Sequence, residues 1–571
     1  MIFKQAHPFK DILLSNKEPG EKYTQTWGKG ITTEKFTKLF MSDKDLFSGY
    51  FHEGKKISFK QEDQILKKPL TGSFVSFHTL DEKIIARCDI FGLGLIYLYQ
   101  YENLWAISNR YEMILDWAKS SGLPLTLKTD HITRGLTSIE QCFRQRHCRE
   151  CDFEQVFLVP LDELVSIDTH GVNTSTNYFF TRLLEAERSE YNELINDAAE
   201  EIKNNTQAIF DCANYKNIIC DLSGGFDSRL VFSAAISTGN AEKVIIRSNP
   251  VENSKDLEIA TTIADSFKLK YLNKQYHPQS FISSVAALES AASYFMGEYF
   301  SYGTTAWSCE GGNNKTCRIS GGGGELYRAV NLKQGNLSST DPENFSGLAT
   351  REIEGFELFN PSTHADTLQQ ELERLPGSPT SRTELHYIFY RNRIHYGMRA
   401  WDSLHESIVF QPAISINLFK ASRCLSAEER AMEKAMLDAT NKILPVATCF
   451  PYATKGNFDI SLINQSDARL KNLILHIASH SRHWETAHQE LKLSTQQNRR
   501  KITSSEALEW REINYKIKSS AIKSMDSIQK SLDSYELQAI FKKAREIEPQ
   551  KKYLPLLLKI ISLGRQVEKY Y

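Results

Sequence analysis

The first 180 residues contain short runs in which apolar and polar residues alternate, and turn residues separate these runs. Such runs predict β-strands, because successive side chains of a strand point to opposite faces. No long helical period competes with them. The predicted strands lie within residues 72–80, 83–92, 93–100, 104–109 and 155–161.

The pattern becomes helical between residues 185 and 213, where apolar residues recur at helical spacing in a polar stretch. From residue 217 to about 320, strand-like runs alternate with helical runs. This alternation is typical of a parallel sheet built from strand–helix–strand units. Residues 380–465 are mainly helical in pattern, and the last hundred residues carry a single glycine, which favours helix there too.

We therefore expect an α/β protein in three parts. Residues 1–183 form a β-rich domain, residues 184–465 form a domain with a parallel sheet, and residues 466–571 form a helical extension.

The composition is that of a folded globular chain, with 41% hydrophobic and 24% charged residues among 571. Because 69 Lys and Arg balance 70 Asp and Glu, the overall charge gives no reason to expect nucleic acid or an anionic membrane as partner. From residue 466 onward, 20 basic residues exceed 12 acidic ones. We interpret this excess as a solvated helix face, with a protein or peptide partner as the alternative.

No apolar run reaches the length of a signal peptide or a transmembrane helix. We expect a cytoplasmic protein without a transmembrane segment. Its ten cysteines are too sparse for a disulfide framework and are expected to be reduced thiols.

The sharpest motif follows the apolar strand of residues 217–220. Its loop residues are Leu222, Ser223, Gly224, Gly225, Asp227 and Ser228. A strand that ends in two glycines before a helix offers free backbone N–H groups to phosphate, and a carboxylate there suits Mg²⁺. There is no Walker-type Gly-Lys-Ser/Thr. The pattern instead resembles the pyrophosphate loop of ATP pyrophosphatases, which implies cleavage of ATP to AMP and pyrophosphate.

A second glycine motif, Ser320-Gly321-Gly322-Gly323-Gly324-Glu325, again follows a strand-like run. It is similar to a segment of the asparagine synthetase family. The resemblance implies that Ser320 and Gly321 bind ATP and that Asp227 and Glu325 together hold Mg²⁺. ATP and Mg²⁺ are thus the expected cofactors.

Lys455 lies in a setting similar to that of the family's catalytic lysine, which neutralises charge on the phosphate and on the attacked carbonyl. Asp256, with Ala260 and Ala264, matches the helix after the family's adenine-binding strand. Residues 89–92 (DIFG) resemble a segment of its N-terminal domain. The similarity covers residues 70 to 465 or so.

The resemblance implies an N-terminal glutaminase-like domain of the Ntn-type αββα fold, followed by a synthetase domain of the ATP-pyrophosphatase type. Glutamine-dependent members need an N-terminal cysteine nucleophile, whereas the first cysteine here is Cys88. We therefore expect a glutaminase-like domain without its chemistry.

An amine of the substrate itself would then attack the adenylated carboxylate, as in β-lactam synthetase and the lasso peptide cyclases. The chain's length and basic helical tail favour macrolactam closure of a lasso peptide precursor, a ribosomally made peptide, within a wide glycine-lined cavity. A precursor peptide, a leader peptidase and a leader-recognition protein are the implied partners, and no nucleic acid is expected.

Gly322 stands where the family has Glu or Tyr, so no side chain there could orient the amine. Residues 391–399, and His395 among them, could supply a base. Other hypotheses stay open: an ammonia-dependent or β-lactam synthetase-like ligase, a tRNA-modifying ATP pyrophosphatase, and a non-catalytic peptide-binding scaffold.

Cys142, His147, Cys148 and Cys151 are of zinc-binding type, but their spacing fits no common zinc pattern. We expect incidental thiols, with a metal site as the alternative.

Overall fold

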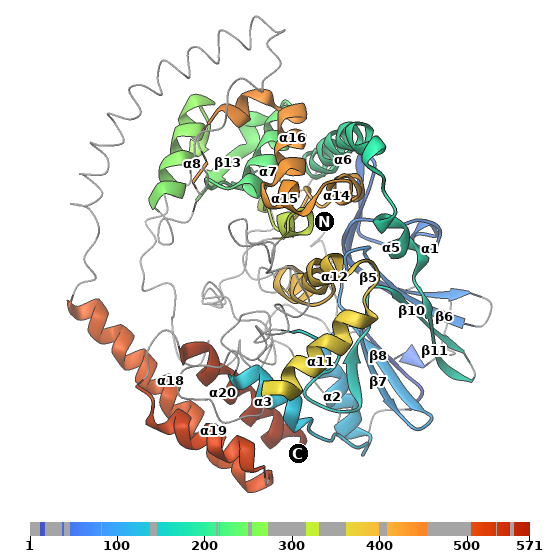
Figure 1. Cartoon of the computed structure of the whole chain (residues 1–571), viewed down its shortest axis with the longest axis vertical. Coiled ribbons are helices and arrows are strands. Elements are labelled where there is room, and N and C mark those ends of the chain that lie inside the picture. Colours follow the sequence, from blue (N-terminus) through green and yellow to red (C-terminus); the bar gives the residue numbers. More distant parts are fainter. Residues whose placement is uncertain are drawn as a thin grey trace, which may run out of the picture.

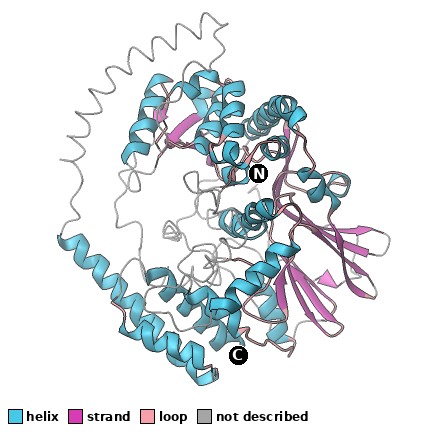
Figure 2. Cartoon of the chain, viewed as in Figure 1, coloured by secondary structure: helices cyan, strands magenta, loops and turns pink. Residues whose placement is uncertain are grey.

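A computed structural model describes residues 12–17, 37–38, 46–80, 83–137, 146–168, 170–212, 215, 217–248, 254–271, 316–329, 361–398, 408–450, 452–453, 504–532, 534–548 and 553–571. It is a mixed α/β fold with two mainly antiparallel sheets and one parallel sheet, surrounded by helices (Figures 1 and 2). The expected α/β class is thereby confirmed.

The two mainly antiparallel sheets come from the first part of the chain. The five-stranded sheet has the order β2 (Thr37–Lys38), β1 (Leu13–Ser15), β8 (Leu104–Ser108), β7 (Tyr97–Tyr101), β9 (Val156–Leu158). The six-stranded sheet has the order β11 (Gly171–Thr176), β10 (Glu163–Asp168), β6 (Lys83–Cys88), β5 (Gly72–Leu80), β3 (Leu46–Glu53), β4 (Lys56–Ser58).

These two sheets share one apolar core, which follows from the period-two pattern of their strands. Leu98 of β7 and Phe77 of β5 belong to the same buried cluster, from one sheet each. Tyr99 points to the other face of β7, where its ring lies 5.3 Å from that of Trp117. We call this pair of sheets the sandwich.

Two helices within the sandwich region were not predicted: α2 (Tyr111–Ser120) and α3 (Thr129–Thr137). Both are short, and nearly all of their residues are buried. They have ten and nine residues, and over so short a run periodicity alone does not separate a helix from a strand.

The parallel sheet has the order β14 (Lys270–Tyr271), β13 (Val244–Arg247), β12 (Asn217–Asp221), β15 (Thr316–Ile319), β16 (Val409–Phe410). Every neighbouring pair is parallel, as the sequence pattern predicted. The chain runs outward from β12 to β14 and then returns to β15 on the other side of β12. In such sheets, ligands bind at the carboxyl ends of the strands where the direction of winding switches, here between β12 and β15.

Helices connect and flank these sheets. A short helix, α1 (Gln64–Lys67), lies between β4 and β5. The described helices between residues 177 and 444 are α5 (Tyr178–Thr181), α6 (Tyr191–Asp211), α7 (Phe226–Ser237), α8 (Ser254–Ser266), α11 (Pro361–Arg374), α12 (Pro379–His386), α14 (Ile416–Arg423), α15 (Ala427–Ala431) and α16 (Lys434–Ile443). Two π-helical segments, Tyr387–Arg391 and Arg393–Gly397, continue α12.

The C-terminal helices are α18 (Ser504–Ser531), α19 (Tyr535–Glu546) and α20 (Leu554–Tyr570). They lie beside α3, at the opposite end of the view from α7 and α8 (Figure 1). The last helix docks on α2 through polar contacts: the Tyr570 hydroxyl donates to Asp116 at 2.7 Å, and the Lys569 ammonium contacts Glu112 at 3.1 Å. Of the helices that the structure describes, none combines the length and apolar character needed to cross a membrane.

This docking contact should make stability depend on pH. Burial raises the pKa of Glu112 from 4.5 to about 7, although Lys569 lowers it. A carboxyl whose pKa is raised on folding contributes stability below its unfolded pKa and loses it as the pH rises through its folded pKa. Between these values, wild type should lose up to about 1.4 kcal/mol per pH unit relative to Glu112→Gln.

Urea denaturation of both proteins at several pH values within that window tests this expectation. Glu154→Gln, at an exposed position of the same region, should keep the wild-type pH dependence. A constant difference between wild type and Glu112→Gln across the window would contradict the assignment.

Candidate functional site

Two glycine loops lie at the point where the winding of the chain through the parallel sheet switches, between β12 and β15. Residues 222–225 connect β12 to α7, and residues 320–323 connect β15 to a 3₁₀-helix, Gly324–Tyr327. Because β12 and β15 are parallel neighbours, both loops leave from the same edge of the sheet. The structure thus brings together the two motifs that the sequence placed almost a hundred residues apart.

The second loop contains glycines because it packs directly on the start of α7. A Cβ at Gly321 would lie 2.6 Å from the backbone nitrogen of Ser228, and one at Gly324 would lie 2.1 Å from Asp227 Oδ1. The atoms that face Gly321 belong to the backbone, so no side chain fits there, whereas a side chain at position 324 would displace the Asp227 carboxylate. Gly323 has a φ of +93°, a left-handed conformation that glycine adopts most easily.

The side chain that is missing at Gly322 is replaced by close packing of neighbouring residues. A Cβ at Gly322 would lie 2.8 Å from the Tyr396 ring and 3.1 Å from Gln411 Nε2. The glycines therefore allow close packing, and the space of the missing side chain at Gly322 is filled by a tyrosine from the π-helical segment.

The first loop is held by its own serines and by α8. The Ser223 N–H donates to Ser228 Oγ at 3.0 Å, and the Gly225 N–H donates to Ser223 Oγ at 3.2 Å. The Gly224 N–H donates to Asp256 Oδ1 at 2.8 Å. These bonds fix the loop around the start of α7, where the first N–H groups of the helix have no partner within the helix. Such an N-terminus is a general site for phosphate.

Three carboxylates surround one guanidinium beside these loops. Arg328 Nη2 lies 2.9 Å from Glu325 Oε1 and 3.7 Å from Asp227 Oδ2, and Arg328 Nη1 lies 3.4 Å from Glu433 Oε1. Asp227 and Glu325, the predicted metal pair, thus face the same cation. Glu433 sits before α16 with a φ of +62°, a strained conformation for a side chain of this size.

The two predicted metal ligands differ in electrostatic environment. Burial raises the pKa of Asp227 to about 7, and the Arg328 charge opposes this only in part. Burial also acts to raise the pKa of Glu325, but Arg328 and a hydrogen bond from Tyr396 outweigh it, and the pKa is lowered. Arg328 lies closer to Glu325 than to Asp227, so its charge lowers the pKa of Glu325 more effectively.

The surroundings of Asp227 Oδ1 show whether these residues fit the predicted Mg²⁺. This atom is buried and has no hydrogen-bond partner among the described residues. A buried carboxylate oxygen without a partner is costly, and carboxylate oxygens are the ligands that Mg²⁺ prefers. The residues present therefore fit a hard divalent cation held by Asp227 and Glu325, with Glu433 nearby.

Tyr396 links the π-helical segment to this carboxylate group. Its hydroxyl donates to Glu325 Oε2 at 2.6 Å. Burial and the neighbouring carboxylate raise its pKa well above 10, so the hydroxyl stays protonated and acts as a donor. His395, the base considered from the sequence, contacts Tyr396 edge to face with ring centroids 4.6 Å apart.

The same π-helical segment is anchored in the sandwich. The buried Arg393 donates to the carbonyls of Gly92 at 3.1 Å and Val159 at 2.7 Å. Gly92 belongs to a turn that the Asp89 carboxylate organises by accepting the N–H of Gly94 at 2.7 Å. The DIFG segment noted in the sequence thus builds a support for the helix that carries Tyr396.

Lys455 lies outside the described residues. Ala453, two positions earlier, donates its N–H to the Gly224 carbonyl at 3.0 Å. The preceding Tyr452 stacks on Phe226 with ring centroids 4.1 Å apart, and the Arg229 guanidinium lies 4.0 Å from the Tyr452 ring centroid. Residues 452 and 453 are therefore fixed to the first glycine loop.

Two other residues that the sequence predicted to bind ATP, Leu222 and Ser320, form hydrogen bonds with nearby backbone groups. Leu222 is buried and donates its N–H to the Arg247 carbonyl at 2.8 Å, and Ser320 Oγ accepts the Gly322 N–H at 3.3 Å. Sequence reasoning missed Arg328 and Glu433. Arg328 follows Glu325 by three positions, a spacing that places two charges side by side on a helix, whereas no local pattern marks Glu433.

No protein-family model matches this chain, and no curated protein matches it significantly.

Removing the Tyr396 hydroxyl should weaken divalent-cation binding while the ring still fills the space beside Gly322. In Tyr396→Phe, Glu325 loses a hydrogen bond that lowers its pKa, and a bond to a charged group contributes about 1.5–3 kcal/mol. We expect about tenfold weaker binding of Mn²⁺, used as a probe for Mg²⁺, in the presence of ATP.

Electron paramagnetic resonance of free Mn²⁺ measures this affinity. Tyr390→Phe is the matched control, because the Tyr390 hydroxyl accepts from Arg374 at 2.8 Å and donates to Glu371, and these contacts involve none of Asp227, Glu325 and Glu433. Equal Mn²⁺ affinity in wild type and Tyr396→Phe would remove Tyr396 from the site.

Proposed function

We propose that this protein is an ATP-dependent ligase that forms an amide bond. It converts a substrate carboxylate and ATP to an acyl-adenylate and pyrophosphate, and an amine of the same molecule then displaces AMP. The proposal rests on one observation: two glycine loops at the switch point of a parallel sheet bring Asp227 and Glu325 against a single guanidinium.

Each group at the site has a role that its position supports. The N-terminus of α7, with Ser223 and Ser228, binds the pyrophosphate portion of ATP. Mg²⁺ held by Asp227 and Glu325 would offset the charge of the phosphate oxygens. Arg328, which balances the carboxylates in the structure, lies where it can also contact phosphate. Lys455 remains the proposed cation for charge that develops during adenylation.

The proposed architecture is a glutaminase-like sandwich without glutaminase chemistry, followed by an ATP-pyrophosphatase-type domain. Two stacked sheets with helices beside them are compatible with an αββα fold. Burial raises the pKa of Cys88 to about 12, so its thiol is not an activated nucleophile. The choice of an internal amine rests on the sequence expectation that no catalytic cysteine is present.

We further propose that the substrate is a lasso peptide precursor and that the reaction closes a macrolactam ring. A peptide held in its folded form would bring its amine next to the activated carboxylate, and such proximity gives a high effective concentration. A leader peptidase and a leader-recognition protein would then act before the ligase in the cytoplasm.

The test is to incubate the purified protein with ATP, Mg²⁺ and candidate precursor peptides, with and without the two partner proteins, and to follow AMP, pyrophosphate and peptide mass. We expect equal amounts of AMP and pyrophosphate, and a peptide lighter by one water. Asp227→Asn should reduce both products by at least about 100-fold, since even changes beyond the metal ligands commonly cost 10- to 100-fold.

Thermal unfolding separates this catalytic loss from misfolding. Because burial opposes ionisation of Asp227, Asp227→Asn should melt no lower than wild type near neutral pH. The exposed Asp265→Asn on α8 is the matched control and should retain activity. AMP without loss of water from the peptide would indicate another amine or another carboxylate, as in an ammonia-dependent ligase. No ATP cleavage with any peptide would leave the non-catalytic scaffold.

A further inference from the structure

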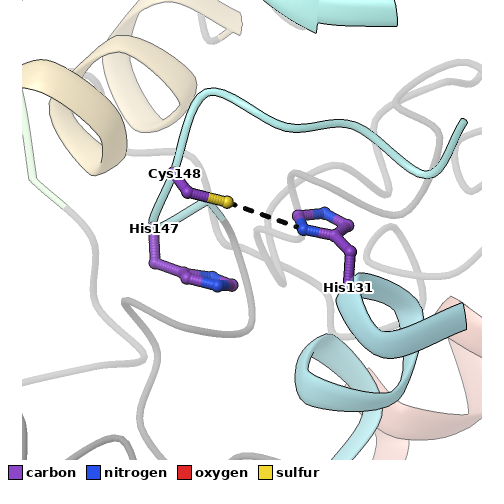
Figure 3. A group of neighbouring side chains, drawn as sticks. All are labelled: His131, His147 and Cys148. Carbon is purple, nitrogen blue, oxygen red and sulfur yellow. Dashed lines mark hydrogen bonds between the residues drawn. The ribbon is translucent and has the colours of Figure 1, made fainter. Parts of the chain in front are cut away.

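A second group of chemically active side chains lies in the sandwich region, apart from the glycine loops. His131 of α3 faces His147 and Cys148, which are adjacent on the segment before β9 (Figure 3). One nitrogen from each histidine and the Cys148 sulfur lie within 4.8 Å of one another, and all three residues are buried. The two imidazole rings are nearly parallel, with centroids 5.6 Å apart.

This grouping differs from the one that sequence spacing offered. Cys151, the second cysteine of the CxxC, points to the Arg146 guanidinium at 3.3 Å, and Cys142 lies outside the described residues. Cys148 instead contacts His131 Nδ1 at 3.6 Å. His131 could not be found from local spacing, because it precedes Cys148 by 17 residues on a helix that the sequence pattern did not predict.

The surroundings orient His131 toward the centre of the group. Its other nitrogen, Nε2, lies 3.7 Å from Asp152 Oδ1, and Asp152 Oδ2 accepts a hydrogen bond from Gln566 of α20 at 3.2 Å. A carboxylate behind a histidine is the usual outer partner of a metal-binding imidazole, because it fixes the tautomer and leaves the opposite nitrogen for the metal.

We propose that His131, His147 and Cys148 bind one Zn²⁺ ion. Two imidazoles and one thiolate are ligands that zinc favours, and three protein ligands with a fourth position for water is a common zinc arrangement.

The local charges are compatible with this ion. Zn²⁺ displaces the thiol proton when it binds, so zinc with the Cys148 thiolate carries one positive charge, which the Asp152 carboxylate balances. Three cations lie near His131. The Arg134 guanidinium is paired with Asp130 and Glu150, each at 3.4 Å, the Arg146 guanidinium contacts the Glu150 carbonyl and Cys151, and Lys559 is the third.

The experiment uses the full chain. Protein stripped with a chelator is reloaded with ZnCl₂, dialysed against metal-free buffer and measured for zinc by elemental mass spectrometry. We expect about one zinc per chain in wild type, and its loss in both Cys148→Ser and His131→Gln. Cys151→Ser, a buried cysteine three residues away that contacts Arg146, should keep the wild-type zinc content.

The proposal would be overturned if reloaded wild type held less than about a tenth of the one zinc ion expected per chain. Equal zinc in wild type, Cys148→Ser and His131→Gln would overturn it too. Cobalt substitution covers the case in which a variant fails to fold. The Co²⁺ forms of wild type and Cys151→Ser should each show a thiolate-to-cobalt charge-transfer band. Absence of this band from wild type would also overturn the proposal. ATP cleavage plays no part in these measurements, so their outcome is independent of the ligase function.

Discussion

The arrangement of the candidate site depends on the backbone contact between the second glycine loop and the start of α7. Gly321 and Gly324 approach Asp227 and Ser228 so closely that a side chain at either position would clash with them. Strand pairing sets the spacing of β12 and β15, and this contact sets how the second loop lies on the start of α7. Its consequence is electrostatic. Asp227 and Glu325, which follow two different strands, come to share the Arg328 guanidinium, and Asp227 Oδ1 is buried without a hydrogen-bond partner among the described residues.

Much of this arrangement could be predicted from sequence. The runs after β12 and β15 combine apolar strands with glycine and serine, and parallel strands place such loops on one edge. The strands at residues 72–80 and 217–221 and the helix of residues 226–237 also followed from local periodicity. These features are encoded within a few neighbouring residues, which is why a single sequence is enough to find them.

What could not be predicted depends on contacts between distant segments. Tyr396 occupies the space of the missing side chain at Gly322, more than seventy positions away, and Glu433 joins Arg328 across another hundred. A glycine that leaves room for a cavity and a glycine that accepts a neighbour's ring have the same local sequence. The difference lies in packing, and a pattern along one chain does not contain it.

The contacts of Arg393 connect the sandwich to the candidate site. The guanidinium bonds two sandwich carbonyls while the same helical segment delivers Tyr396 to Glu325. The sandwich therefore supports the helical segment that carries Tyr396. A substitution that displaces the carbonyl of Gly92 or Val159 would act on Glu325 through Arg393 and Tyr396, although neither residue contacts the carboxylates.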